Sequence, residues 1–268
     1  MKVGIIGFGV VGNAISNTLS KVYSIVPFDR YLGLNDVASL VKCDFIFISV
    51  PTPFDCLKNK VDQTAVVENL TLLSKRNYKG IVIIKSTLPP GSTKNFLNNF
   101  NLKIVFNPEF LRESTTPNED FENQEIVVIG TDDLELFSSV KIMYDLVLRK
   151  GTKYHSVTPT EAEMIKYSQN TMLAGRVALA NMIFDACQKL KIDYDNIRDI
   201  GFTPFEILGP HMSQVPGPDG KRGFGGKCLP KDISGFNSII ESNLLKEIIV
   251  YNESLRDDLD KVLMNFKK

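Results

Sequence analysis

The sequence predicts an α/β protein whose N-terminal part is a doubly wound parallel sheet and whose C-terminal part is an all-helical domain. Over the first 150 residues, short and nearly continuous apolar runs alternate with helical stretches, which is typical of parallel strands covered on both faces. After about residue 157 the pattern changes to long helical stretches. We therefore expect two domains, residues 1–157 and residues 158–268.

The expected strands are apolar runs that recur along the first domain. Near-continuous Val, Ile and Phe suit strands that are buried on both faces, and strands that alternate with helices favour a parallel sheet. The runs are Val3–Ile6, Tyr23–Phe28, Phe45–Val50, Ile81–Ile84, Ile104–Phe106 and Ile126–Ile129.

The second domain is expected to begin with a long helix. Thr158-Pro159-Thr160-Glu161 is a capping box with proline at the first helical position, and the helix is expected to run to about Leu190. A short helix that is capped by Asp193 and ended by Gly201 follows. Residues 203–226 are rich in Gly and Pro, and a long loop of this kind is functional or disordered.

A last helix is expected from about Asn243 to Phe266, and it carries a heptad-like seam. The seam consists of Leu245, Ile248, Asn252, Leu255, Leu259, Val262 and Phe266. An amphipathic helix that packs on its own domain is the simpler interpretation. A subunit contact in which Asn252 sets the register is the alternative.

Composition argues against several classes of protein. Lys and Arg total 31, as do Asp and Glu, so no global field would attract nucleic acid or an anionic membrane. No apolar run approaches the roughly 18 residues of a transmembrane helix, and the N-terminus lacks the signal-peptide pattern. The four cysteines show neither CxxC pairing nor metal-ligand spacing. We therefore expect a cytoplasmic protein without a metal site.

A glycine-rich turn indicates a dinucleotide site. Gly7-Phe8-Gly9-Val10-Val11-Gly12 is a G-x-G-x-x-G motif between the first expected strand and a helix, as in Rossmann-like domains. Gly7 permits the tight turn, and Gly9 lets the backbone approach a pyrophosphate at the positive helix end. Gly12 allows the helix and the strand to pack closely.

Three further strand ends are expected at the same edge of the sheet, where open α/β sheets bind ligands. Asp29 ends the second strand, and a carboxylate there binds the adenosine ribose and repels a 2′-phosphate. NAD is therefore favoured over NADP, although the neighbouring Arg30 favours the opposite choice. The third strand ends in Ser49-Val50-Pro51-Thr52-Pro53, and the fourth ends in Lys85-Ser86-Thr87-Leu88-Pro89-Pro90-Gly91.

Two polar segments are candidates for chemistry. One follows a strand and holds two carboxylates four residues apart, in Asn107-Pro108-Glu109-Phe110-Leu111-Arg112-Glu113. A solvated charged turn would show the same composition. The other is the pair Lys166 and Asn170, which share one face of the long helix because side chains four residues apart line up. A solvated helix face is the alternative for this pair.

The third candidate segment combines glycines with a cysteine, in Gly223-Phe224-Gly225-Gly226-Lys227-Cys228-Leu229-Pro230-Lys231-Asp232. Pro230 fits the first turn of a helix, which places Cys228 just before its N-terminus, where the helix dipole favours a reactive thiolate. Asp232 would lie near that thiol. A buried, inert thiol is the usual alternative, and it fits Cys43 and Cys187, which lie inside apolar patterns.

Six segments in this order resemble the signatures of the UDP-glucose/GDP-mannose dehydrogenase family: GFGVVG, VPTP, KSTLPPG, NPEFLRE, EAEMIKYSQN and GFGGKCLPKD. The resemblance spans Met1 to about Phe266, and it is strongest to the UDP-glucose 6-dehydrogenase members. It implies a Rossmann-like NAD-binding domain and a helical central domain that forms a dimer. It also implies a four-electron oxidation of a sugar C6 alcohol to a carboxylate, with two NAD⁺ used in succession.

The resemblance implies a catalytic role for each matching residue. Cys228 would attack the aldehyde intermediate, and the thiohemiacetal would become a thioester that water hydrolyses. Lys166 and Asn170 match the pair that stabilises the oxyanion. Asp232 matches a carboxylate that works with an ordered water, and Glu113 matches the base for thioester hydrolysis.

Binding roles are implied in the same way. Thr87 and Glu109 match residues that hold the water and the nicotinamide end of the site. The implied cofactor contacts are Gly7, Gly9, Val10, Val11, Gly12, Asp29, Arg30, Pro51, Thr52, Pro53, Thr87 and Glu113. The implied nucleotide-sugar contacts are Glu109, Phe110, Leu111, Arg112, Lys166, Asn170, Phe224, Gly225 and Gly226.

The sequence departs from the family pattern in three respects. The family continues into a third, UDP-binding domain, which we expect this chain to lack because it stops at Lys268. Glu125 and Ile207 stand where the family usually has arginine. Lys221 and Arg222 would supply the lost positive charge to a diphosphate, or they are solvated loop charges.

Three functions therefore stay open. The first is a compact UDP-glucose 6-dehydrogenase, and the second is the same chemistry on GDP-mannose or a UDP-N-acetyl sugar. The third is a non-catalytic NAD-binding dimer that needs a partner chain to supply the missing domain. A complete set of candidate catalytic residues favours the first, namely Cys228, Lys166, Asn170, Asp232 and Glu113.

Overall fold

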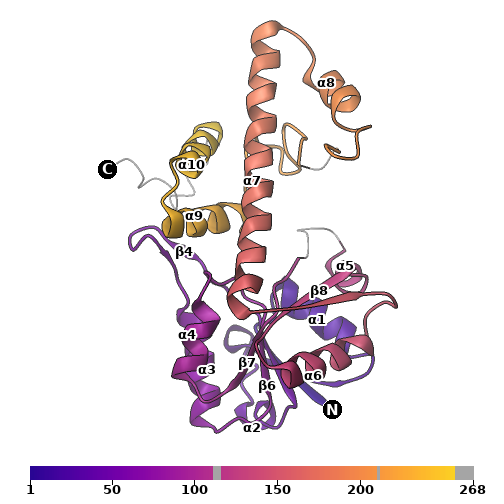
Figure 1. The fold of residues 1–268 in the computed structure, drawn as a ribbon, viewed down its shortest axis with the longest axis vertical. Helices are drawn as coiled ribbons and strands as arrows, with labels where there is room; N and C mark the ends of the chain where they lie inside the picture. Colours follow the sequence, from indigo (N-terminus) through magenta and orange to yellow (C-terminus); the bar gives the residue numbers. More distant parts are fainter. Residues whose placement is uncertain (111–115, 210–211, 257–268) are drawn as a thin grey trace. The chain divides into compact units, whose positions relative to one another are not determined.

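The computed structural model describes residues 1–110, 116–209 and 212–256, and the chain divides into two compact units (Figure 1). Unit 1 comprises residues 1–53 and 62–166, and unit 2 comprises residues 54–61 together with the chain from residue 167 onward. The predicted domain boundary between residues 157 and 158 stays a prediction, because a compact unit need not be a domain that folds independently.

Unit 1 is built on a seven-stranded sheet in the order β2-β1-β3-β6-β7-β8-β9. The chain runs outward from β1 to β2 and then returns to the other side of β1 with β3, so the strand order reverses between β1 and β3. The predicted doubly wound fold is confirmed, since the neighbours from β2 to β7 pair in parallel. The strands are β1 (Lys2–Ile6), β2 (Ser24–Phe28), β3 (Phe45–Ile48), β6 (Ile81–Ile84), β7 (Lys103–Phe106), β8 (Ile126–Gly130) and β9 (Lys153–Val157).

The far edge of the sheet differs from the predicted pattern. β8 pairs antiparallel with β7 through Phe106 and Gly130, and parallel with β9 along its whole length. The Asn107 side chain also joins the two strands, because its Nδ2 donates to the Val128 carbonyl at 2.7 Å. β9 is not among the predicted strands, since this edge strand is largely exposed and its sequence, KYHSV, holds no apolar run.

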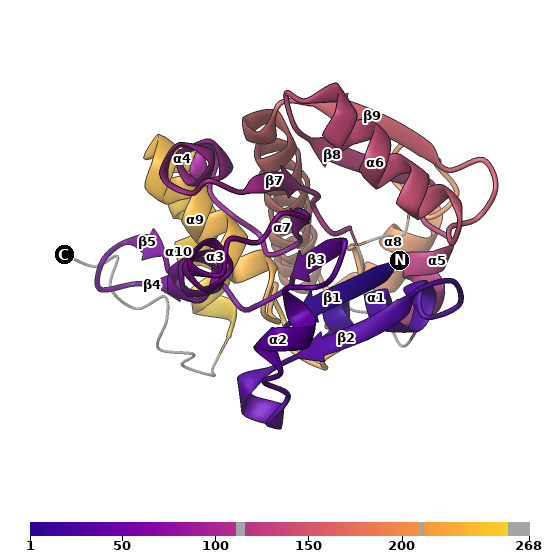
Figure 2. The same cartoon turned by 90° about the horizontal axis from the view of Figure 1, so that it is seen from below.

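Helices cover both faces of the sheet, as the doubly wound prediction requires (Figure 2). Phe45 and Phe47 belong to a buried cluster with α1, α5 and α6, whereas Ile46 and Ile48 belong to a second cluster with α2, α3, α4 and the start of α7. This alternation is the two-residue period of a strand. The helices are α1 (Val10–Leu19), α2 (Val37–Leu40), α3 (Thr64–Lys75), α4 (Ser92–Asn99), α5 (Pro117–Glu122) and α6 (Leu134–Asp145), and η1 is a single 3₁₀ turn (Arg30–Leu32).

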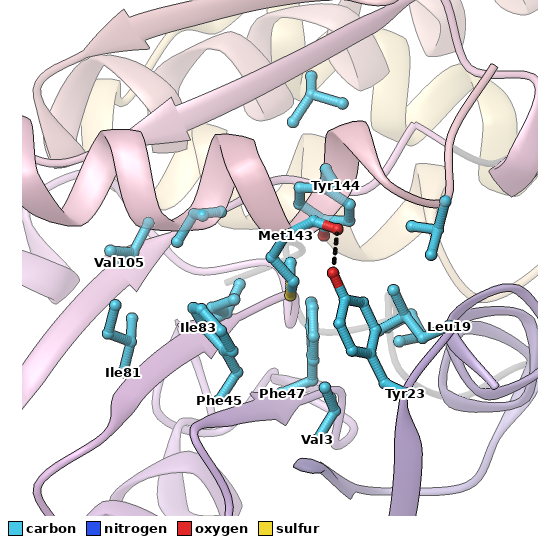
Figure 3. Close-up of a cluster of buried hydrophobic side chains, with 14 of the residues drawn as sticks. Val3, Leu19, Tyr23, Phe45, Phe47, Ile81, Ile83, Val105, Met143 and Tyr144 are labelled. Atoms are coloured by element: carbon cyan, nitrogen blue, oxygen red, sulfur yellow. Dashed lines mark hydrogen bonds between the residues drawn. The ribbon is translucent and has the colours of Figure 1, made fainter. Parts of the chain in front are cut away.

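A hydrogen bond joins two members of the first cluster (Figure 3). Tyr23 is the residue before β2, and its hydroxyl donates to the Met143 carbonyl of α6 at 2.9 Å. Burial raises the pKa of Tyr23, so this hydroxyl keeps its proton. The bond satisfies a polar group that would otherwise weaken the core.

The long helix α7 (Pro159–Leu190) has the predicted limits. The capping box forms as expected: the Thr158 backbone N–H donates to Glu161 Oε2 at 2.8 Å, and the Glu161 N–H donates to Thr158 Oγ1 at 3.3 Å. α8 (Tyr194–Gly201) is capped by Asp193, which accepts from the Asp195 N–H at 2.9 Å. No helix of the described residues is long and apolar enough to cross a membrane.

Unit 2 contains two more helices and, beyond the helices predicted for it, a small hairpin. The helices are α9 (Leu229–Ile240) and α10 (Asn243–Leu255), and the hairpin pairs β4 (Phe54–Asp55) with β5 (Lys60–Val61). The prediction of one helix to Phe266 is wrong, because α10 ends at Leu255 and Arg256 has an extended backbone. The predicted seam positions beyond residue 256 lie outside the described residues. At Asn252 the packing interpretation holds, because this side chain is 2% exposed and bonds to the Phe224 backbone of its own unit.

Candidate active site

The glycine turn of unit 1 has the geometry that the motif predicts. Gly7 has φ +90°, and a Cβ there would lie 2.8 Å from the Ser49 carbonyl oxygen. A Cβ on Gly12 would lie 1.9 Å from the Gly7 carbonyl oxygen, so the helix packs against the turn with no room for a methyl group. Gly9 is the N-cap of α1 and faces open space. The residues present therefore fit a pyrophosphate at this helix N-terminus.

The loops at the carboxyl ends of β1, β3 and β6 are tied together by hydroxyl groups. Ser49 Oγ donates to the Gly7 carbonyl at 2.8 Å, and Ser86 Oγ donates to the Val50 carbonyl at 2.7 Å. Thr52 Oγ1 donates to the Thr87 carbonyl at 2.8 Å. Predicted cofactor residues from three strands are thus brought to one edge of unit 1, with Pro51 and Pro53 exposed on either side of buried Thr52.

Asp29 lies beside the glycine turn, as predicted. Its Oδ2 accepts from the Phe8 N–H at 2.9 Å, and its Oδ1 accepts from the Tyr31 N–H at 2.9 Å. Both bonds fix the carboxylate at the end of β2, next to the open face of Gly9. Arg30 is exposed and forms an ion pair with Glu68 of α3. Arg30 would have to leave Glu68 to make its predicted contact with the cofactor.

The segment after β7 is described only as far as Phe110. Glu109 forms an ion pair with Lys85, with 2.9 Å between Oε2 and Nζ. The Phe110 ring lies 5.6 Å from Lys166 Nζ, so these two predicted substrate residues are neighbours in unit 1. The solvated-turn alternative is wrong for Glu109, whose side chain is 11% exposed. Leu111, Arg112 and Glu113 lie outside the described residues.

The predicted thiol lies at the start of a helix in unit 2. Cys228 is the N-cap of α9 and is exposed, with Pro230 in the first turn. Cys43 and Cys187 are buried, as predicted, and burial raises the pKa of Cys43 to about 11. An exposed thiol at a helix N-terminus has the features of a reactive cysteine, and a buried thiol with a raised pKa has those of an inert one.

Two buried polar side chains accompany the thiol. Asp232 lies in the first turn of α9 and is 0% exposed, and Asn170 of α7 is 5% exposed. Asn170 Nδ2 donates to Asp232 Oδ2, and Lys231 Nζ pairs with Asp232 Oδ1. Lys166, one turn before Asn170 on α7, is 8% exposed. The solvated-face alternative is therefore wrong for Lys166 and Asn170.

Side chains from α10 hold the glycine loop that precedes the thiol. Asn252 Oδ1 accepts from the Phe224 N–H at 2.6 Å, and its Nδ2 donates to the Phe224 carbonyl at 3.0 Å. The Arg256 guanidinium donates to the carbonyls of Arg222 and Gly223, both at 3.3 Å. A Cβ on Gly225 would lie 2.6 Å from the same guanidinium.

Arg256 has no predicted role, and its sequence position gives no signal for one. It is the C-cap residue directly after α10, far from the loop in sequence, and only the tertiary fold brings it to the loop. Asn252 has one weak signal, since it is the polar residue within an otherwise apolar seam.

The remaining charged positions are held by local partners. Arg222 is half-buried, pairs with Asp185 at 2.5 Å and lies 5.0 Å from the Phe184 ring. It is therefore not the solvated loop charge of one interpretation, and its binding to a diphosphate stays a prediction. Glu125 is exposed beside Arg149, and Ile207 is 94% exposed. Among the described residues, no group of three or more His, Cys, Asp or Glu is placed to hold a metal.

Comparison with known proteins identifies the family. Residues 26–148 match the UDP-glucose/GDP-mannose dehydrogenase family, NAD binding domain, and residues 160–254 match the central domain of the same family. UDP-glucose 6-dehydrogenase of Campylobacter jejuni is 30% identical, over 100% of this chain and 76% of that protein. UDP-glucose 6-dehydrogenase of Rickettsia typhi is 32% identical over 78% of this chain. The chain spans about half the length of the Rickettsia relatives, with 49% covered in that case.

Solved structures show the same fold. A UDP-glucose dehydrogenase of Pyrobaculum islandicum is similar with a TM-score of 0.81 and 24% identity, over 94% of this chain and 68% of that chain. A UDP-D-ManNAc dehydrogenase of Pyrococcus horikoshii has a TM-score of 0.80 and 20% identity, over 95% and 69%.

The fold and the glycine turn define a dinucleotide-binding α/β protein, and its second unit presents a thiol at a helix start. The chain belongs to the UDP-glucose/GDP-mannose dehydrogenase family. Its N-terminal part is therefore an NAD-binding domain of that family.

Proposed function

We propose that this chain oxidises the C6 alcohol of a nucleotide-sugar to a carboxylate, with UDP-glucose as substrate and UDP-glucuronate as product. One observation carries the proposal. Cys228 is exposed at the start of α9, and Asp232 in the first turn of that helix is bonded to Asn170. GDP-mannose and UDP-N-acetyl sugars are alternative substrates of the same chemistry.

The reaction divides into two oxidations and a hydrolysis. The alcohol loses two electrons and becomes an aldehyde, and the Cys228 sulfur adds to that aldehyde to give a thiohemiacetal. Loss of two more electrons gives a thioester, and water then releases the carboxylate and restores the thiol. One alcohol and one water thus yield one carboxylate, two hydrides and three protons. The thiol is restored at the end.

Buried polar groups supply what these steps need. Lys166 and Asn170, one helical turn apart and both nearly buried, are proposed to donate hydrogen bonds to the oxygen on which negative charge develops. Asp232, held by Asn170 and Lys231, is proposed to accept a proton through an ordered water. Glu113 is proposed as the base for thioester hydrolysis, and Thr87 and Glu109 to hold the water and the nicotinamide end.

The glycine turn is proposed to hold the cofactor. NAD⁺, when bound, accepts the hydride in each oxidation. The N–H groups at the start of α1 would bind the pyrophosphate beside the open face of Gly9, and Asp29 would bind the adenosine ribose hydroxyls. A carboxylate at the end of β2 repels a 2′-phosphate, which supports NAD rather than NADP.

We also propose a cytoplasmic homodimer. The part of α7 in unit 2 exposes several large apolar side chains, and exposed apolar surface of this kind marks protein contacts. They are Met172, Leu179, Met182 and Leu190, each more than half exposed. Sedimentation equilibrium tests the proposal, and a monomer at all concentrations would contradict it.

The decisive experiment measures NADH by absorbance with purified protein, excess NAD⁺ and limiting UDP-glucose. Two NADH per sugar are expected, and Cys228→Ala is expected to produce no carboxylate, a loss of about 10⁴-fold or more. Cys56→Ala is the matched control, since that half-buried thiol lies in the hairpin and has no proposed role. Measurable NAD⁺ binding without NADH from UDP-glucose, GDP-mannose or UDP-N-acetyl sugars would instead support the non-catalytic interpretation.

A further inference from the structure

Lys85 is a buried cation at the carboxyl end of β6 that has no role in the proposed chemistry. Its side chain is 1% exposed. Its Nζ lies 2.9 Å from Glu109 Oε2, 3.0 Å from Asn107 Oδ1 and 3.3 Å from the Pro108 carbonyl oxygen. An ammonium group is costly to bury unless it is paired and hydrogen-bonded, and here all of these partners come from the Asn-Pro-Glu segment that follows β7.

The same segment is fixed from two other sides. Asn107 Oδ1 also accepts from the Tyr144 hydroxyl of α6 at 2.6 Å, and its Nδ2 donates to the Val128 carbonyl of β8 at 2.7 Å. Asn107 thus binds groups from three elements at once. The backbone before Glu109 is thereby held in one position, and Lys85 is the group that reaches the carboxylate itself.

The ion pair is asymmetric, and the asymmetry suggests what it does. The cation is fully buried, whereas the Glu109 side chain is 11% exposed. Glu109 therefore lies at the rim of the carboxyl edge of the sheet, where such folds bind ligands. Apolar side chains can often replace a buried ion pair without loss of stability, so packing alone does not require one here. A buried cation that contacts a carboxylate at a ligand-binding edge instead fixes the position of that carboxylate.

We propose that Lys85 is a positioning residue of the oxidation, which fixes the Glu109 carboxylate where it holds the reacting end of the site. This inference rests on the proposed function. Lys85 itself does not touch substrate or cofactor, and it acts through Glu109.

Several groups set the charge of the pair. Burial lowers the pKa of Lys85, and the nearby Glu109 charge opposes that effect. Burial raises the pKa of Tyr144, and the Glu109 charge adds to it, so this hydroxyl stays neutral. Tyr154 of β9 also stays neutral, since burial raises its pKa. Lys85 therefore supplies positive charge in direct contact with Glu109.

The test compares Lys85→Met and Lys85→Arg with a matched control, Lys141→Met. Lys141 is a half-exposed lysine of α6 whose Asp145 pair lies at the surface. The values of kcat and KM are measured across the pH range of activity. Lys85→Met is expected to lower kcat about 100-fold at neutral pH with KM for NAD⁺ changed less than about threefold. Lys85→Arg is expected to recover about a tenth of wild-type kcat, and Lys141→Met to match the wild type.

An equal loss of kcat in Lys85→Met and Lys85→Arg, or a rise in KM for NAD⁺ as large as the loss of kcat, would overturn the inference and leave a structural role. A second measurement requires neither turnover nor a Lys85 substitution. It uses nuclear magnetic resonance of ¹⁵N-lysine-labelled protein to follow the titration of the Lys85 ammonium group. The pKa of Lys85 is expected to be lower in Glu109→Gln than in the wild type, because the Glu109 charge is gone. Identical titrations would refute the coupling. Absence of NADH in the wild type would refute the proposed function, whereas this titration would still decide whether the pair exists.

Discussion

Unit 1 and unit 2 each contain a glycine-rich turn that leads into a helix, and the two turns are built differently. The turn before α1 is packed against backbone, since the missing Cβ atoms of Gly7 and Gly12 would meet carbonyl oxygens. The turn before α9 is packed against side chains, since those of Gly223 and Gly225 would meet Asn252 and Arg256. The first helix starts at a bare glycine, and the second starts at Cys228.

The difference indicates a division of tasks. A turn that is fixed by backbone and left without a side chain at its helix start suits a constant anion such as a pyrophosphate. A loop that is fixed by side chains can adopt another conformation when those side chains are substituted. Such a loop suits a substrate that differs between members of a family. Under the proposed function, substitutions in α10 are expected to alter the choice of sugar nucleotide. Substitutions in the turn after β1 are expected to disrupt folding or NAD binding.

The largest effect is expected at Gly12. Gly12→Ala places a methyl group 1.9 Å from a backbone oxygen that cannot move aside, so we expect a loss of about 3 kcal/mol or more in unfolding free energy. Gly225→Ala meets the end of the flexible Arg256 side chain at 2.6 Å, and we expect a loss of about 1 kcal/mol or less. Urea unfolding followed by circular dichroism measures both. Equal losses in the two variants would contradict the comparison.

A smaller effect is expected from the polar groups that fix each turn. Asn252→Ala leaves the Phe224 N–H and carbonyl without their partner, which is expected to cost about 2 kcal/mol. Ser49→Ala removes one hydroxyl bond to Gly7 and is expected to cost about 1 kcal/mol.

Titration calorimetry separates the effects of these two variants on ligand binding. Asn252→Ala is expected to weaken the sugar nucleotide and not NAD⁺, and Ser49→Ala the reverse. The same ligand weakened in both variants would count against separate tasks.

Local signals in the sequence are enough to predict much of this architecture. The apolar runs predict β1, β3 and β6 because strands buried on both faces have no polar positions. The capping box and Pro159 predict the start of α7, and Pro230 predicts Cys228 at the start of α9. Each of these features is encoded within a few residues, so no tertiary information is needed.

Partners that are distant in the sequence are not predictable in this way. The pattern of Lys166 and Asn170 is the same for a solvated face as for a buried one, and only the fold shows that both are nearly buried. The sequence places Lys85 only in a turn that ends a strand. Its pairing with Glu109 is not predictable because it depends on β6 and β7 being neighbours in the sheet. The loop contact of Arg256 likewise depends on how α10 packs.

A third helix start in the same chain shows what a filled N-terminus looks like. Glu163 of α7 is 0% exposed, and its carboxylate accepts from the Gly91 N–H at 2.6 Å and the Thr93 N–H at 2.7 Å, at the start of α4. Here the protein supplies its own anion to the helix. The start of α1 has no acidic residue in its first turn and no side-chain cap, which is what a site for an external anion requires.

The smallest expected effect is a pH dependence that sets this filled end apart. Burial raises the pKa of Glu163 above its usual 4.5, although hydrogen bonds from Thr93 and Gly91 oppose burial. The folded state then binds more protons than the unfolded state between these two pKa values. The contribution of Glu163 to stability is therefore full below about pH 4.5 and is lost as the pH rises through the folded-state pKa. Relative to Glu163→Gln, the wild type is expected to lose unfolding free energy as the pH rises through this window.

Glu161, two residues earlier on α7, provides a control of opposite sign. Hydrogen bonds from Thr158 lower its pKa, so its contribution is present above the unfolded-state pKa and is lost as the pH falls through the folded one. Urea unfolding at a series of pH values, for the wild type, Glu163→Gln and Glu161→Gln, measures both differences. Slopes of the same sign would contradict the prediction and show that the hydrogen bonds from the start of α4 outweigh burial at Glu163.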